Sequence, residues 1–265
     1  MLKRKILIIT NPGEKDSLED YCSGVYVDKD NYISYFTSAG GGYYDRNSEI
    51  VCLDKPTANS VAQEIASWKR LEIGFSIIIF SGHGAYYQPR DSNKWKLNKH
   101  ETMYASDIKG ATPKQIIIED CCREKTNTPA TYNFSNKKAS VMDSRIGYAF
   151  LDPERCKRLY NKKVLNCAPQ IIQGLSCDIN EYSEDDDRRG GLYSRTLLEI
   201  ARKHIRDGES LAPGYRQTNK YKPIGFISCH KDAEGIVVAS SNNTQNPRLM
   251  KPKSEGPFLP FGIIA

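Results

Sequence analysis

Four short runs, each rich in isoleucine, constrain the fold of this chain more than any other feature. They occupy residues 5–10, 76–81, 115–119 and 170–175. Each run lacks the polar alternation of a half-exposed strand, so each is typical of a strand buried on both faces. Strands of this kind usually lie in parallel sheets that are covered by helices. The sequence therefore predicts an α/β fold.

Helical patterns separate these runs. Between the first two, apolar side chains recur at helical spacing at Val61, Ile65, Trp68 and Leu71. Thr57 or Asn59 is the expected N-cap of this helix. A second amphipathic helix is expected after Gly190 and Gly191, and residues 152–165 also have helical character.

The alternation of strand and helix predicts a single domain over residues 1–265, with a mostly parallel central sheet and helices on both faces. The exception is the long, polar and basic connection over residues 123–167, because connections of this length are usually functional or mobile. Towards the end of the chain, the apolar pieces at 224–228 and 236–239 are expected to be edge strands.

Composition limits the function classes. The chain has 265 residues, 39% of them hydrophobic, and a net charge of +6 spread along its length. No recognised nucleic-acid-binding motif accompanies the basic residues, so we expect no nucleic-acid partner. The N-terminal apolar run is too short for a secretory core or a membrane span. We therefore expect a cytoplasmic protein with no membrane association, whose eight cysteines are reduced thiols.

Two of the buried runs end in residues that carry chemistry. The second is followed by Gly82, His83 and Gly84, and the third by Asp120, Cys121, Cys122 and Arg123. Function concentrates at the carboxyl ends of strands in open α/β sheets. If the two strands are neighbours, His83 and a cysteine lie within reach, and such a pair suffices for nucleophilic acyl transfer. A buried structural cysteine is the alternative, whereas paired zinc-ligand motifs are absent from the sequence.

These motifs resemble those of the caspase, metacaspase and paracaspase clan of cysteine proteases, especially its bacterial members. Their separation, 122 − 83 = 39 residues, is somewhat shorter than the roughly 50 of caspases. The likeness extends in order through residues 24–28, 40–42, 56–59, 190–194, 245–247 and 258–261. It implies a caspase-like three-layer fold, with a large segment over about 1–122, a connecting loop over 123–167 and a small segment over 168–265.

The resemblance also implies roles for individual residues. Cys122 is the expected nucleophile, with Cys121 as its competitor, and His83 is the expected general acid/base. The backbone N–H groups of Gly84 and Cys122 would form the oxyanion hole. The implied partners are protein or peptide substrates. No cofactor is expected, although the sequence leaves calcium dependence and the oligomeric state open.

Substrate preference is implied by acidic residues. Asp120 stands where caspases that cut after Asp have a glutamine, so cleavage after Arg or Lys is expected. Asp185 matches the second pocket carboxylate of metacaspases by its spacing from Ser176, and Asp178 is a nearer candidate. The expected substrate-binding residues are therefore Asp120, Ser176, Asp178 and Asp185.

The connecting loop would offer such an enzyme sites for self-processing, with Lys137, Lys138 and Arg145 as the favoured ones. An uncut single chain is the alternative to this self-processing. A caspase-like adaptor or binding module is the alternative to an enzyme.

Overall fold

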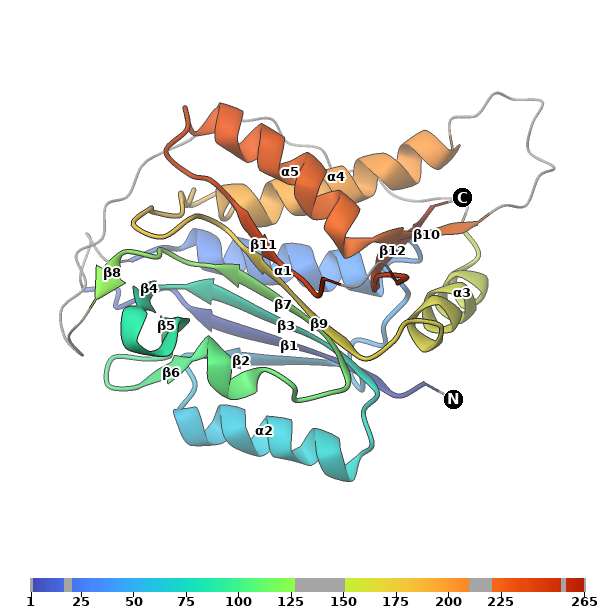
Figure 1. The fold of residues 1–265 in the computed structure, drawn as a ribbon, viewed down its shortest axis with the longest axis horizontal. Coiled ribbons are helices and arrows are strands. Elements are labelled where there is room, and N and C mark those ends of the chain that lie inside the picture. The colour runs from blue at the N-terminus through green and yellow to red at the C-terminus, as the bar shows by residue number, and fades with distance from the viewer. Residues whose placement is uncertain (1, 17–20, 127–150, 210–220, 254–255, 265) are drawn as a thin grey trace.

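The fold is built around a central sheet of six strands. The structure is a computed structural model, and it describes residues 2–16, 21–126, 151–209, 221–253 and 256–264. Within these residues the strand order is β11-β9-β7-β3-β1-β2 (Figure 1). The strands are β1 (Arg4–Asn11), β2 (Ile50–Asp54), β3 (Phe75–Gly82), β7 (Lys114–Asp120), β9 (Gln170–Leu175) and β11 (Arg248–Met250). Neighbours pair in parallel except β11, which is antiparallel to β9. The mostly parallel α/β sheet is thereby confirmed, and the four isoleucine-rich runs are β1, β3, β7 and β9.

Helices cover both faces of this sheet (Figure 1). They are α1 (Gly24–Thr37), α2 (Ala58–Arg70), α3 (Pro153–Leu165), α4 (Leu192–Glu209) and α5 (Phe226–Ser240). Helix α2 begins as predicted, because the Thr57 side chain accepts a hydrogen bond of 3.1 Å from the Ser60 N–H. Helix α3 likewise has Asp152 as its N-cap, bonded to the Arg155 N–H.

Two apolar cores explain why the strand sequences show no polar alternation. In β1, Ile6 and Ile8 belong to the core shared with α1, α3, α4 and α5. Leu7 and Ile9 point to the opposite face and pack with Val61 and other residues of the α2 side. Because successive side chains of a strand alternate between faces, a strand covered on both sides must be apolar at every position.

A smaller sheet lies beside the C-terminal ends of the central strands. Its order is β6-β5-β4-β8. The strands are β4 (Gly84–Tyr87), β5 (Ser92–Lys96), β6 (Thr102–Tyr104) and β8 (Lys125–Thr126), with short 3-10 turns at Gln88–Arg90 and Ala105–Ile108. β10 (Lys222–Gly225) and β12 (Pro260–Ile264) form a separate antiparallel pair.

The expectation of edge strands is met in 224–228 only by Ile224 and Gly225, which end β10, and it is wrong for 236–239. Strand β10 ends at Gly225, and helix α5 begins at the next residue and includes the whole of 236–239. The buried residues of α5 recur at helical rather than strand spacing, at Phe226, Ile227, Cys229, His230, Ala233 and Val237. Burial of this stripe against α4 and the sheet outweighs the strand propensity of the local Ile-Val-Val run.

Part of the connecting loop, residues 127–150, is outside the described residues, and so are the proposed cleavage sites at Lys137, Lys138 and Arg145. The eight cysteines all fall within the described residues, and each is a free thiol. Among the helices that the structure describes, none combines the length and apolar character that a membrane span requires.

Candidate active site

The register of the central sheet brings His83 and Cys122 to one edge. Strands β3 and β7 are parallel neighbours, and Ser81 is paired with Asp120 at their carboxyl ends. Both His83 and Cys122 stand two residues beyond these paired positions, and both line the same pocket. The expectation that these two strands are adjacent is therefore confirmed.

Glycines on either side of His83 allow the backbone there to pack closely against Asn11 and against the two cysteines. Gly82 has a φ of 150°, and a Cβ there would lie 2.4 Å from the Asn11 carbonyl oxygen. A Cβ on Gly84 would lie 2.6 Å from the Cys121 sulfur and 3.4 Å from the Cys122 carbonyl oxygen. The backbone next to the histidine thus packs directly against the cysteine pair, which a larger residue would prevent.

The two neighbouring cysteines lie in different environments. Cys121 is 2% exposed, and its backbone N–H and C=O are both bonded to the Ser176 hydroxyl, at 3.2 and 3.1 Å. Cys122 is partly exposed. Burial raises the pKa of the Cys122 thiol to about 12, and the carboxylates of Asp120 and Glu124 add to the increase. The resting thiol is therefore protonated, so nucleophilic chemistry at Cys122 needs a base beside it.

Three aspartates line this pocket, Asp28, Asp120 and Asp185, together with Glu184. Asp120 accepts hydrogen bonds from the Ser194 N–H, at 2.9 Å, and from the Ser183 hydroxyl. Asp28 accepts hydrogen bonds from the Ser81 hydroxyl at 2.7 Å and from the Gly191 N–H at 3.0 Å. The donors to Asp120 and Asp28 are thus uncharged hydroxyl and backbone N–H groups.

Each of the three aspartate carboxyl groups occupies space that a glycine leaves by lacking a side chain. A Cβ would lie 2.1 Å from an Asp185 oxygen at Gly24, 2.1 Å from an Asp28 oxygen at Gly190 and 2.3 Å from an Asp120 oxygen at Gly191. The glycines at the start of α1 and just before α4 therefore make room for the acidic pocket.

Burial and repulsion from neighbouring acids disfavour ionisation of Asp28 and Asp185. Burial raises the pKa of Asp28 well above its ordinary value, and the charges of Asp120 and Asp185 raise it further. Burial, with Asp120 and Asp187, raises the pKa of Asp185 to about 7. A cation that entered the pocket would favour the ionised forms and relieve the repulsion. The pocket is therefore suited to a positively charged group.

Replacing Asp185 with asparagine is expected to change the pH dependence of stability. Its folded-state pKa is raised, so between about pH 4 and about pH 7 the folded protein binds more protons than the unfolded chain, and stability falls as pH rises. The Asp185→Asn variant lacks this loss. Urea unfolding at about pH 5 and about pH 8 should show that the free energy of unfolding of this variant, relative to that of wild type, is larger at the higher pH. The exposed control Asp30→Asn should show no such gain, and equal pH dependence in all three proteins would contradict the assignment.

Two of the predicted substrate-binding residues are placed differently. Ser176 is buried beneath Cys121. Asp178 forms ion pairs with Arg248 and, at 3.9 Å, with Arg123. Neither is among the residues that line the pocket with Cys122.

Asp28 is the site residue to which sequence reasoning gave no role. It lies on α1 among the buried residues Gly24, Val25, Tyr32, Tyr35 and Phe36. An acid on the inward stripe of an otherwise apolar helix face was the available signal, because a buried carboxyl group needs a specific partner.

Fold and pocket together define a caspase-like α/β domain, with a cysteine and a histidine at adjacent strand ends. The caspase domain model matches residues 3–222, so the chain belongs to the caspase-domain family, a family of cysteine proteases. The structure is similar to the crystal structure of Caspase-1 from Spodoptera frugiperda, with a TM-score of 0.52 and 11% sequence identity. That match covers 94% of this chain and 86% of the caspase chain, and it shows the shared fold. The comparison with curated proteins returns no match.

Proposed function

We propose that this protein is a cysteine endopeptidase that cleaves protein substrates after Arg or Lys. The observation that carries the proposal is one pocket lined by His83, Cys122 and four acidic residues, three of them aspartates. Membership of the caspase-domain family supports the peptidase chemistry. The acidic lining supports the choice of a basic residue before the scissile bond.

In the proposed reaction His83 accepts the proton of the Cys122 thiol, whose raised pKa makes such a base necessary. The thiolate attacks the substrate carbonyl, and His83 then gives the proton to the leaving amine. Water hydrolyses the thioester and regenerates the thiol. The oxyanion would be stabilised by the backbone N–H groups of Gly84, which adjoins His83, and of Cys122 itself.

The substrate's basic side chain would enter among Asp28, Asp120 and Asp185. Its charge would favour the ionised carboxylates, which would accept charge-assisted hydrogen bonds that are stronger than neutral ones. An acidic side chain would meet only repulsion from the same groups. This pocket would therefore discriminate by charge.

Self-processing is part of this proposal. A protease with basic specificity would find Lys137, Lys138 and Arg145 within its own connecting segment. Intact-mass measurement would detect fragments ending at these residues in wild type and not in Cys122→Ala, whereas an active enzyme that remains uncut would reject this part.

Profiling the purified protein against a mixed peptide library, with and without calcium, tests the proposed function. We expect cleavage after Arg and Lys. Cleavage mainly after Asp would refute the basic specificity. A folded protein that cleaves no peptide, and whose Cys122 does not react with an arginyl chloromethylketone, would instead be a binding module.

A further inference from the structure

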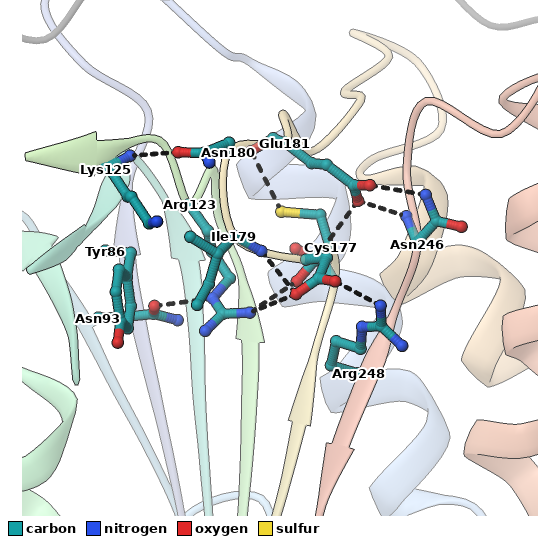
Figure 2. Close-up of polar contacts among 12 residues, drawn as sticks. Tyr86, Asn93, Arg123, Lys125, Cys177, Ile179, Asn180, Glu181, Asn246 and Arg248 are labelled. Atoms are coloured by element: carbon teal, nitrogen blue, oxygen red, sulfur yellow. Dashed lines mark hydrogen bonds and ion pairs between the residues drawn. The ribbon is translucent and has the colours of Figure 1, made fainter. Parts of the chain in front are cut away.

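Arg123 directly follows the proposed nucleophile, and its side chain is buried, with 7% of the residue exposed. Its guanidinium donates a hydrogen bond of 2.9 Å to the Asn93 side-chain oxygen and one of 3.1 Å to the Cys177 carbonyl oxygen. It also lies over the Tyr86 ring, 5.4 Å from the ring centre (Figure 2). A buried arginine with this many directed contacts fixes the segments that it joins.

One of these segments carries His83. Tyr86 and Asn93 face each other in the β4–β5 hairpin, and β4 begins one residue after the histidine. The histidine carbonyl oxygen accepts a hydrogen bond of 2.9 Å from the Lys96 N–H at the end of β5. Arg123, the residue after Cys122, is therefore connected through its guanidinium to the hairpin that begins beside His83.

Asn93 is itself fixed in orientation. Its side-chain N–H₂ donates to the buried Glu119 carboxylate at 2.9 Å, so its oxygen is the atom turned to the guanidinium. Glu119 also accepts a hydrogen bond of 2.7 Å from the Trp95 indole. The contact between Arg123 and the hairpin is therefore anchored in the central sheet.

The loop after β9 is the other segment that Arg123 holds. The Arg123 backbone N–H donates to the Glu181 carbonyl oxygen, and its carbonyl oxygen accepts from the Asn180 N–H, both at 2.9 Å. These two bonds belong to the backbone, so they survive replacement of the side chain. The same loop is tied to β11 by the ion pair between Asp178 and Arg248. Figure 2 also shows the bonds between Glu181 and Asn246, which lies just before β11.

We propose that Arg123 is a positioning residue for the peptidase reaction, whose guanidinium fixes Cys122 relative to His83 without touching the substrate. This inference rests on the proposed function. A lysine would keep the charge, but it has no planar fork to reach Asn93 and the Cys177 carbonyl together and no flat face to lie on Tyr86. The geometry thus requires a guanidinium rather than a positive charge.

The test is Arg123→Lys, assayed with the peptide that wild type cleaves best. We expect kcat to fall by about 10- to 100-fold, because small misplacements of reacting groups cost rates of that order. KM should change less than about twofold, since Asp120 is held by its own bonds to Ser194 and Ser183. The control is Arg90→Lys, which replaces an exposed arginine that also contacts a tyrosine ring and a carboxylate, those of Tyr104 and Asp107.

Chemical rescue separates positioning from folding. In Arg123→Ala, methylguanidinium at millimolar concentration should restore part of kcat, and methylammonium should restore none. A merely structural role would lower the melting temperature without this selectivity. If both Arg123 variants fail to fold, Tyr86→Leu, with Tyr87→Leu as its control, removes the ring beneath the guanidinium and should lower kcat in the same way.

The rate at which iodoacetamide alkylates Cys122, followed by mass spectrometry over a range of pH, distinguishes the two proposals. If Cys122 of the wild-type protein is alkylated rapidly but the protein cleaves no peptide, the proposed function is refuted. The alkylation rates of wild type and Arg123→Lys can still be compared in that case. A slower rate with a shifted pH profile in Arg123→Lys supports positioning. A wild-type pH profile in that variant, or wild-type kcat where peptides are cleaved, would overturn the inference.

Discussion

Replacing Cys122 with alanine is expected to abolish peptide hydrolysis, with a loss of about 10⁴-fold or more, because no other group supplies the proposed nucleophile. Replacing His83 with alanine should cost a similar amount. The pKa of the Cys122 thiol is raised to about 12, so hardly any thiolate exists at neutral pH without a base to remove the proton. Turnover of an arginyl peptide and melting temperature should be measured together, since both variants are expected to fold.

Cys121→Ala is the matched control for this experiment. It removes a thiol from the adjacent position, yet the Cys121 sulfur packs behind Gly84 and the residue is 2% exposed. We expect this variant to lose some stability through the small cavity and to keep most of its activity. Full activity in Cys122→Ala, or inactivity in Cys121→Ala at unchanged stability, would reassign the nucleophile.

The strands and the cysteine–histidine pair were predictable because their signals are local. Isoleucine runs without polar alternation identify buried strands, and the residues just beyond such runs lie at the functional edge of a parallel sheet. His83 and Cys122 lie two residues beyond Ser81 and Asp120 respectively, the last residues at which β3 and β7 pair with each other. Neighbouring strands then bring them together without further information.

The acidic pocket was less predictable because distant segments assemble it. Asp28 reaches the site from α1, where it contacts Gly190 and Gly191 just before α4. Sequence spacing alone does not reveal that a glycine at one position makes room for a carboxyl group more than a hundred residues away. Spacing from Ser176 favoured Asp185, which does line the pocket, whereas the nearer candidate Asp178 is paired with Arg248. Helix α5 was missed for a related reason, since its burial against α4 is decided by tertiary packing.

Replacing Asp120 with asparagine is expected to lower kcat/KM for arginyl and lysyl peptides by at least about tenfold, because a charge-assisted hydrogen bond is worth roughly 1.5–3 kcal/mol. Asparagine keeps an oxygen that can accept from the Ser194 N–H, so the pocket should retain its shape.

The same substitution should make the nucleophile more reactive towards a small probe. The Asp120 charge raises the pKa of Cys122, so its removal lowers that pKa and should speed alkylation of Cys122 by iodoacetamide at about pH 8. Slower cleavage after basic residues together with faster alkylation separates loss of substrate recognition from damage to the site. Asp187→Asn, at the margin of the same loop, is the charge-matched control and should change the cleavage of basic peptides much less. Unchanged preference for Arg and Lys in Asp120→Asn would show that the pocket does not select its substrate through this carboxylate.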